Sequence, residues 1–139
     1  MRYPLLLGLA ALAAVAVPIA QSSAAFAAAP TVPSAAQRRS ILDALRPAIA
    51  HRLGPNLEFV VRDIRVSDGW AFVNAVPQRR GGGRIDGRAY FGDDFENMDG
   101  LTVTALLQFR EGRWALMDHV IGATDAWYCG LGHDHLVGC

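Results

Sequence analysis

The chain has 139 residues with 13 basic and 13 acidic side chains, so its formal net charge at pH 7 is zero. A balanced charge provides no general attraction to nucleic acids or anionic membranes, and we expect neither as a partner. All 13 basic residues are arginine, and a chain without lysine cannot form a Walker-type phosphate loop or a Schiff base.

Residues 1–27 have the three parts of a secretory signal peptide. Arg2 is the only charged residue before Arg38, and residues 4–20 form a nearly unbroken apolar segment. Small residues that suit a signal peptidase follow this segment. Its length of about 17 residues is short for a membrane-spanning helix, which needs ~20. We therefore expect a cleaved protein that is exported to the periplasm or secreted, with no membrane association after cleavage.

The sequence predicts one domain after the signal peptide. Cleavage is expected after Ala27, with Ala25 and Ala29 as alternative sites. Residues 28–33 are expected to form a flexible tether, because they contain nothing that requires order. Residues 34–139 are enough for a single domain with its own core.

A kinked helix is predicted at the start of this domain. Ser34 and Gln37 form a capping box, and Gly54-Pro55 is a typical stop signal. Pro47 interrupts the hydrogen bonds of the helix, while the apolar residues continue past it in phase. These apolar residues recur at helical spacing and are Ile41, Leu42, Leu45, Ile49 and Leu53.

Two β-hairpins are predicted after the helix. The first joins residues 57–66, with a bulge near Arg62, to residues 70–76 through a turn at 67–69. The second joins residues 101–110 to residues 113–121 through Glu111-Gly112. One kinked helix on a four-stranded antiparallel sheet gives an α+β fold, and its layout resembles the cystatin and NTF2-like architectures.

The segment between the hairpins, residues 77–100, is too long for an idle connection. Its first half is rich in arginine and glycine, and its second half is acidic. We expect Tyr90, Phe91 and Phe95 to attach the second half to the domain, as a helical turn. The acidic residues 93–99 do not have the spacing of an EF-hand calcium loop.

Several short motifs resemble those of a family of small exported bacterial proteins of unknown function. This resemblance covers residues 41–129 and implies no activity and no catalytic residues. The motifs are Val60–Phe72, Pro77-Gln78, Gly83–Asp86, Ala105–Leu107, Gly112–Trp114 and Ile121–Asp125.

The C-terminal tail contains both cysteines of the chain. Cys129 and Cys139 enclose His133 and His135 in a C-x3-H-x-H-x3-C pattern. An even pair of cysteines in a small exported domain indicates a disulfide. A zinc site that uses His133 and His135 is the weaker alternative, because the spacing matches no common zinc module. We expect no metal and no cofactor.

Asp118 is the carboxylate with the greatest catalytic interest. It lies two residues from both Leu116 and Val120, so simple strand alternation places it on an apolar surface. With a two-residue turn, Asp118 faces the same side as Phe109, whereas a bulged turn would place it on the opposite side. A carboxylate in an apolar pocket could act as a general base, and Tyr90 is the second candidate catalytic residue. A structural role, paired with arginine or backbone donors, is the alternative and the one we expect.

The remaining histidines and the tryptophans are expected to be solvated or packed without a catalytic role. His119 is expected on the face opposite Asp118 as a surface imidazole, and His51 on the solvated flank of the helix. Trp70, Trp114 and Trp127 are expected to pack in the core and at its edge.

Three functions are compatible with these features. The leading prediction is an exported non-catalytic domain that binds a small ligand or an envelope protein at the sheet or at residues 77–100. The second is an NTF2-like pocket enzyme that uses Asp118. The third is a cystatin-type protease inhibitor, which is disfavoured because the chain lacks the Q-x-V-x-G motif.

Overall fold

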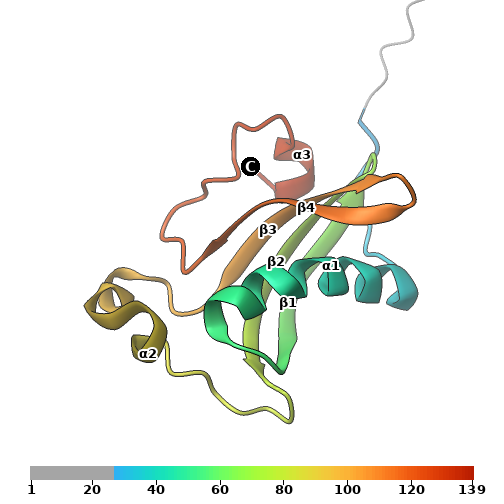
Figure 1. Ribbon diagram of the computed structural model, residues 1–139. Helices are drawn as coiled ribbons and strands as arrows, with labels where there is room; N and C mark the ends of the chain where they lie inside the picture. The colour runs from blue at the N-terminus through green and yellow to red at the C-terminus, as the bar shows by residue number, and fades with distance from the viewer. Residues whose placement is uncertain (1–26) are drawn as a thin grey trace, which may run out of the picture.

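A computed structural model describes residues 27–139 (Figure 1). The predicted signal peptide lies outside these residues, apart from Ala27. No helix in the described part of the chain is long and apolar enough to cross a membrane. The elements are α1 (Ala35–Leu53), β1 (Leu57–Ser67), β2 (Trp70–Arg79), α2 (Arg88–Phe91), η1 (Gly92–Asn97), β3 (Val103–Arg110), β4 (Arg113–Ile121) and α3 (Asp134–Val137).

The four strands form one antiparallel sheet in the order β1-β2-β3-β4, and α1 packs across one of its faces (Figure 1). This confirms the predicted α+β class. Both hairpin turns contain two residues with positive φ, which are Asp68 and Gly69 in one turn and Glu111 and Gly112 in the other. Such turns follow the right-handed twist of the paired strands and set their register.

Helix α1 begins and ends where the sequence predicts. The Ser34 hydroxyl accepts a hydrogen bond of 3.2 Å from the Gln37 backbone N–H. Pro47 lies inside the helix, and the Gly54 N–H closes its last turn on the Ala50 carbonyl. The kink at Pro47 and the cystatin or NTF2-like layout stay predictions.

The main core lies between α1 and the sheet. It is built from the apolar stripe of the helix and the side chains that alternate strand residues direct toward it. Among its fully buried members are Ile41, Leu45, Ile49, Leu53, Val73, Val103 and Leu107.

The second face of the sheet is covered by the C-terminal segment, residues 122–139. Leu136 is fully buried and packs with Val137 against Phe72 and Leu106. The Trp127 indole N–H donates a 2.8 Å hydrogen bond to the Thr104 hydroxyl on the same face. The sheet is therefore packed on both sides, which the sequence did not predict.

A bulge in β4 corrects the predicted environment of Asp118. The turn has the two-residue register, because Phe109 pairs with Trp114. Farther along, Leu107 pairs with Leu116 but Leu106 pairs with Asp118, so Met117 is an extra residue in the strand. One extra residue reverses the side to which all later side chains point. Asp118 consequently lies on the face opposite α1.

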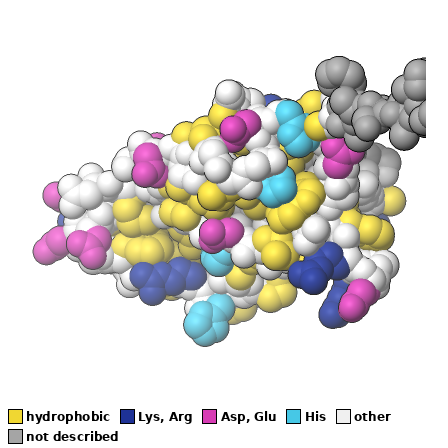
Figure 2. Space-filling view, turned by 90° about the horizontal axis from the view of Figure 1, so that it is seen from above, with side chains coloured by type: hydrophobic (Ala, Val, Ile, Leu, Met, Phe, Trp, Pro, Cys, Tyr) yellow, Lys and Arg dark blue, Asp and Glu magenta, His cyan; other side chains and the backbone are white. Residues whose placement is uncertain are grey.

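Residues 77–100 contain the tail of β2 and the short helices α2 and η1. Phe91 and Phe95 pack against the main core, as predicted. The Arg79 guanidinium donates hydrogen bonds to the Leu53 carbonyl at 2.7 Å and to the Tyr90 hydroxyl at 2.6 Å. Acidic side chains gather at this end of the molecule, and hydrophobic side chains are exposed along its middle (Figure 2).

Candidate functional site

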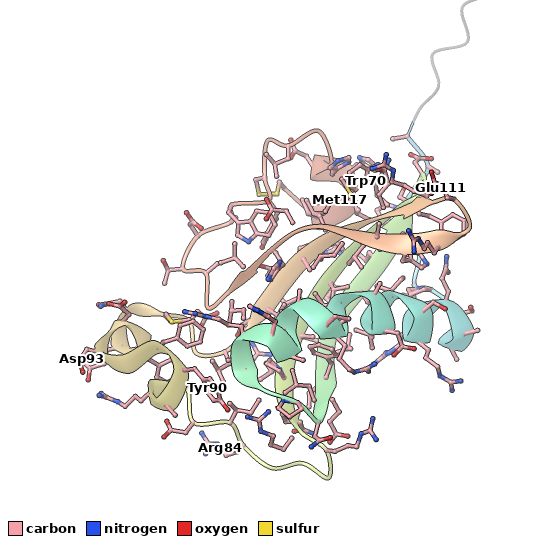
Figure 3. All side chains as sticks on the ribbon, viewed as in Figure 1. Trp70, Arg84, Tyr90, Asp93, Glu111 and Met117 are labelled. Atoms are coloured by element: carbon pink, nitrogen blue, oxygen red, sulfur yellow. A yellow bond between two sulfur atoms is a disulfide. The ribbon has the colours of Figure 1, made fainter. Side chains whose placement is uncertain are left out.

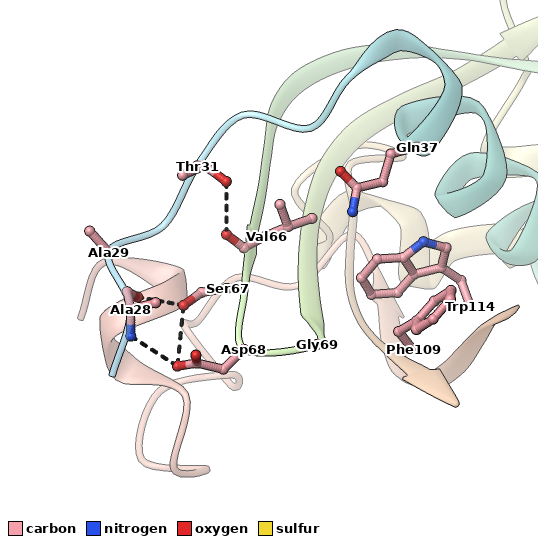
Figure 4. Close-up of a pocket in the computed structure, with 10 residues that line it drawn as sticks. All are labelled: Ala28, Ala29, Thr31, Gln37, Val66, Ser67, Asp68, Gly69, Phe109 and Trp114. Carbon is pink, nitrogen blue, oxygen red and sulfur yellow. Dashed lines mark hydrogen bonds between the residues drawn. The ribbon is translucent and has the colours of Figure 1, made fainter. Parts of the chain in front are cut away.

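A groove crosses the surface where the start of α1, the β1–β2 turn and the β3–β4 hairpin meet (Figure 4). One part has a volume of about 370 Å³ and the adjoining part about 520 Å³. Both parts are lined by Gln37, Phe109 and Trp114. We call this feature the aromatic groove. Its other lining residues are Ala28, Ala29, Thr31, Ser34, Ala36, Ser40, Val66, Ser67, Asp68, Gly69, Gly112 and Arg113.

Two aromatic rings form the apolar surface of this groove. Phe109 and Trp114 are cross-strand partners, and their ring centroids lie 5.3 Å apart in an edge-to-face arrangement. Phe109 remains 50% exposed although it points to the same side of the sheet as α1. Trp114 is half-buried and packs against the main core, so the exposed Phe109 ring and the accessible part of the indole offer apolar area to another molecule.

Polar groups lie at both ends of the aromatic pair. The half-buried Gln37 side chain is directed toward the Trp114 indole, and its amide makes no hydrogen bond to another described residue (Figure 4). The Asp68 carboxylate lies at the β1–β2 turn, and the exposed Arg113 guanidinium lies at the hairpin. The Gly69 carbonyl accepts a 2.7 Å hydrogen bond from Phe109 N–H, which fixes the turn against β3.

One wall of the groove is made by residues 28–31, part of the predicted tether. Thr31 forms an antiparallel bridge with Val66 through two hydrogen bonds of 2.9 Å. The Ala28 N–H donates a 3.1 Å hydrogen bond to the Asp68 carboxylate, and the Ser67 hydroxyl donates one to the Ala28 carbonyl. These residues therefore have a defined position beside β1.

The predicted catalytic pair, Asp118 and Tyr90, does not form a site. Asp118 is exposed, and its carboxylate accepts a 2.8 Å hydrogen bond from the backbone N–H of His119. This backbone donor matches the predicted structural pairing, but the apolar surroundings that we expected are absent. Tyr90 lies in α2, whereas Met117, the neighbour of Asp118, lies on β4 toward the opposite end (Figure 3).

His119 lies on the face opposite Asp118, as predicted, but it is half-buried and not a surface imidazole. The bulge at Met117 turns its side chain toward the α1 face, where it is half-buried and lines a pocket together with His51. This histidine pocket has a volume of about 470 Å³. Arg52 also lines it, with its guanidinium 4.6 Å from the centroid of the Phe91 ring. Two imidazoles and a guanidinium can bind an anion by hydrogen bonds.

The C-terminal cysteines are within disulfide distance, as predicted. Cys129 and Cys139 are joined in the structure, with their Cα atoms 5.8 Å apart. The His133 ring packs on Trp70 at a centroid distance of 3.9 Å, and the His135 Nε2 atom lies 3.8 Å from Asp68 Oδ2. Within residues 27–139, no group of three or more His, Cys, Asp or Glu side chains has a metal-binding arrangement.

Trp114 packs against the main core, as predicted, but sequence reasoning did not identify the aromatic groove that it also lines. A signal was nevertheless present. Phe109 and Trp114 flank a tight turn whose other residues are Arg110, Glu111, Gly112 and Arg113, a polar environment that offers little to bury an aromatic ring.

Comparisons with known proteins found no match: no family model fits the chain, and no curated protein or solved structure is significantly similar to it.

Proposed function

We propose that this protein is an exported, non-catalytic binding domain and that the aromatic groove is its binding site. The occupant we infer is a planar, largely apolar ring with a hydrogen-bonding substituent, either a small molecule or an aromatic side chain of an envelope protein. The observation that carries the proposal is the half-exposed Phe109 ring, packed edge-to-face with the half-buried Trp114 indole beside the Gln37 amide.

The chemistry of the groove supports this choice of occupant. A flat ring placed on Phe109 and Trp114 would bury apolar area on both sides of the edge-to-face pair. The Gln37 amide can donate or accept a hydrogen bond, so it can orient a hydroxyl, amide or amine substituent. Apolar lining with a few convergent polar groups is the usual character of a small-molecule site.

Export is supported by two features. Residues 1–27 have the composition of a signal peptide, and Cys129 and Cys139 lie at disulfide distance in a small domain. Disulfides persist in oxidising compartments such as the periplasm and the extracellular space.

The binding proposal is tested with N-phenyl-1-naphthylamine, a neutral aromatic amine whose fluorescence rises in apolar sites. We expect the parent to bind the dye and Phe109→Ala to bind it about tenfold more weakly, a loss of about 1.4 kcal/mol, because part of the contact area of the ring is removed. Leu131→Ala is the matched control, since Leu131 is 51% exposed and lies outside the groove.

Equal dye affinities of the parent and Phe109→Ala would contradict the proposal. An equal loss of dye affinity in Leu131→Ala would also contradict the proposal, because the dye would then report general surface hydrophobicity. Thermal unfolding of each variant shows that the comparison is made between folded proteins.

A further inference from the structure

The main chain of Ala28 is held at both of its polar groups. Its N–H donates a 3.1 Å hydrogen bond to Asp68 Oδ2, and its carbonyl accepts a hydrogen bond from the Ser67 hydroxyl (Figure 4). Three residues later, Thr31 and Val66 exchange two backbone hydrogen bonds of 2.9 Å. The segment is therefore fixed at Ala28 as well as at Thr31, although its sequence contains nothing that requires order.

Ala28 is also the residue that becomes the N-terminus if the signal peptide is removed after Ala27. Hydrolysis of the Ala27–Ala28 peptide bond gives the hydroxyl of water to the Ala27 carboxyl group and leaves an amine on Ala28. This α-amine is mostly protonated at neutral pH. Cleavage at this bond thus converts the neutral N–H beside Asp68 into a positively charged ammonium group.

We propose that Asp68 is the binding site for the α-ammonium group of the mature N-terminus, so that signal-peptide cleavage creates an ion pair that fixes one wall of the aromatic groove. The inference rests on the export part of the proposed function and is independent of ligand binding. Charge-assisted hydrogen bonds are roughly twice as strong as neutral ones. The His135 Nε2 atom, 3.8 Å from Asp68 Oδ2, is the other potential cation near this carboxylate.

The position of Ala28 distinguishes the three candidate cleavage sites. Cleavage after Ala25 would leave two further residues between the ammonium group and Ala28, and cleavage after Ala29 would remove Ala28 altogether. Only cleavage after Ala27 places the new charge next to the Asp68 carboxylate. The proposed ion pair therefore requires cleavage at the Ala27–Ala28 bond.

The absence of lysine makes a selective experiment possible, since the α-amine is the only primary amine in a mature chain. The full-length chain is exported, the mature protein is purified, and its N-terminus is identified by intact mass and N-terminal sequencing. N-hydroxysuccinimidyl acetate is then used to acetylate the α-amine, with hydroxylamine treatment to remove any ester products. The rate of addition of a single acetyl group is measured by mass spectrometry.

We expect an N-terminus at Ala28 and an acetylation rate about two- to fivefold faster in Asp68→Asn than in the parent, because the paired ammonium group is less reactive. Acetylation should lower the Tm of the parent by about 2–5 °C and leave that of Asp68→Asn unchanged within about 1 °C. Asparagine suits the positive φ at this turn position, so the variant should fold. The matched control is Asp125→Asn, an exposed carboxylate outside the turn, which should behave like the parent.

The outcomes separate this inference from the function on which it rests. A mature N-terminus at Ala28 with equal acetylation rates in the parent and Asp68→Asn would overturn the Asp68 site and leave export intact. A protein that retains residues 1–27 would overturn both. An N-terminus at Pro30 would overturn the site while supporting export. None of these readouts depends on dye binding to the groove.

Discussion

Replacing both Cys129 and Cys139 by serine should lower the free energy of unfolding of the oxidised protein by about 2.7 kcal/mol. The two cysteines are 10 residues apart in sequence, and they close the C-terminal segment that covers the second face of the sheet. In the chain-entropy model, a ring of this size restricts the unfolded chain by this amount. This loss applies to a variant whose C-terminal segment stays packed on the sheet.

Packing should hold the C-terminal segment on the sheet when the disulfide is absent. Leu136 is 0% exposed and Val137 is 6% exposed, and both pack near Phe72. Exposing a buried side chain of this size costs about 1.5–3 kcal/mol. Detachment would expose both side chains at a cost of about 3–6 kcal/mol, so we expect the segment of the double-serine variant to remain packed.

Urea denaturation followed by tryptophan fluorescence measures this loss, because Trp70 and Trp127 contact the second face. The reduced parent should unfold at the same urea concentration as the double-serine variant. If the C-terminal segment detaches, the tryptophan fluorescence of the folded variant should shift to longer wavelength. An unfolding free energy within about 0.5 kcal/mol of the oxidised parent would refute the stabilising role assigned to the cross-link.

Two further predictions concern single side chains. Leu136→Ala should lower the unfolding free energy by about 2–5 kcal/mol in urea, because it leaves a cavity against the second face, whereas the exposed Leu131→Ala should change it by no more than about 0.5 kcal/mol. Asp118→Asn should leave the Tm within about 2 °C of the parent in a thermal melt, since an asparagine oxygen can accept the same hydrogen bond from His119 N–H. A fall of the Tm by 8 °C or so on that substitution would contradict the exposed position of Asp118.

The elements that the sequence predicts well are those defined by local chemistry. The helix is defined by Ser34 at its start, an apolar stripe, and Gly54 at its end. The hairpins are defined by Asp68-Gly69 and Glu111-Gly112, which adopt the positive φ that such turns require. The bulge near Arg62 is also confirmed, because the register shifts between Val61 and Asp63. In each case the decisive residues are neighbours in the chain.

The bulge in β4 shows where local reasoning fails. Residues 114–120 have no glycine or proline to mark an irregularity, and their side-chain types fit more than one register. Packing decides between them, because Leu116 is placed toward α1 and Asp118 toward solvent. This one extra residue at Met117 changes the faces of both Asp118 and His119, so it also changes which catalytic hypotheses are physically reasonable.

The aromatic groove and the covered second face depend on contacts between distant segments. Gln37 lies beside Trp114 only because α1 packs over the end of the second hairpin. Ala28 and Asp68 are hydrogen-bonded although they are 40 residues apart in sequence. Leu136 likewise packs near Phe72 only because the C-terminal segment folds back over the sheet. No local pattern of residue types specifies contacts between segments that are so far apart in sequence.

The most direct test of the binding proposal is a nuclear magnetic resonance map of where p-cresol, an analogue of a tyrosine side chain, contacts the ¹⁵N-labelled mature protein. We predict concentration-dependent shifts at the Gln37 side-chain amide, at the Trp114 indole N–H and along residues 109–114. The Trp127 indole N–H, which bonds to Thr104 on the other face, should not shift. Shifts centred on the histidine pocket instead of the aromatic groove, or no shifts at all, would contradict the proposed function.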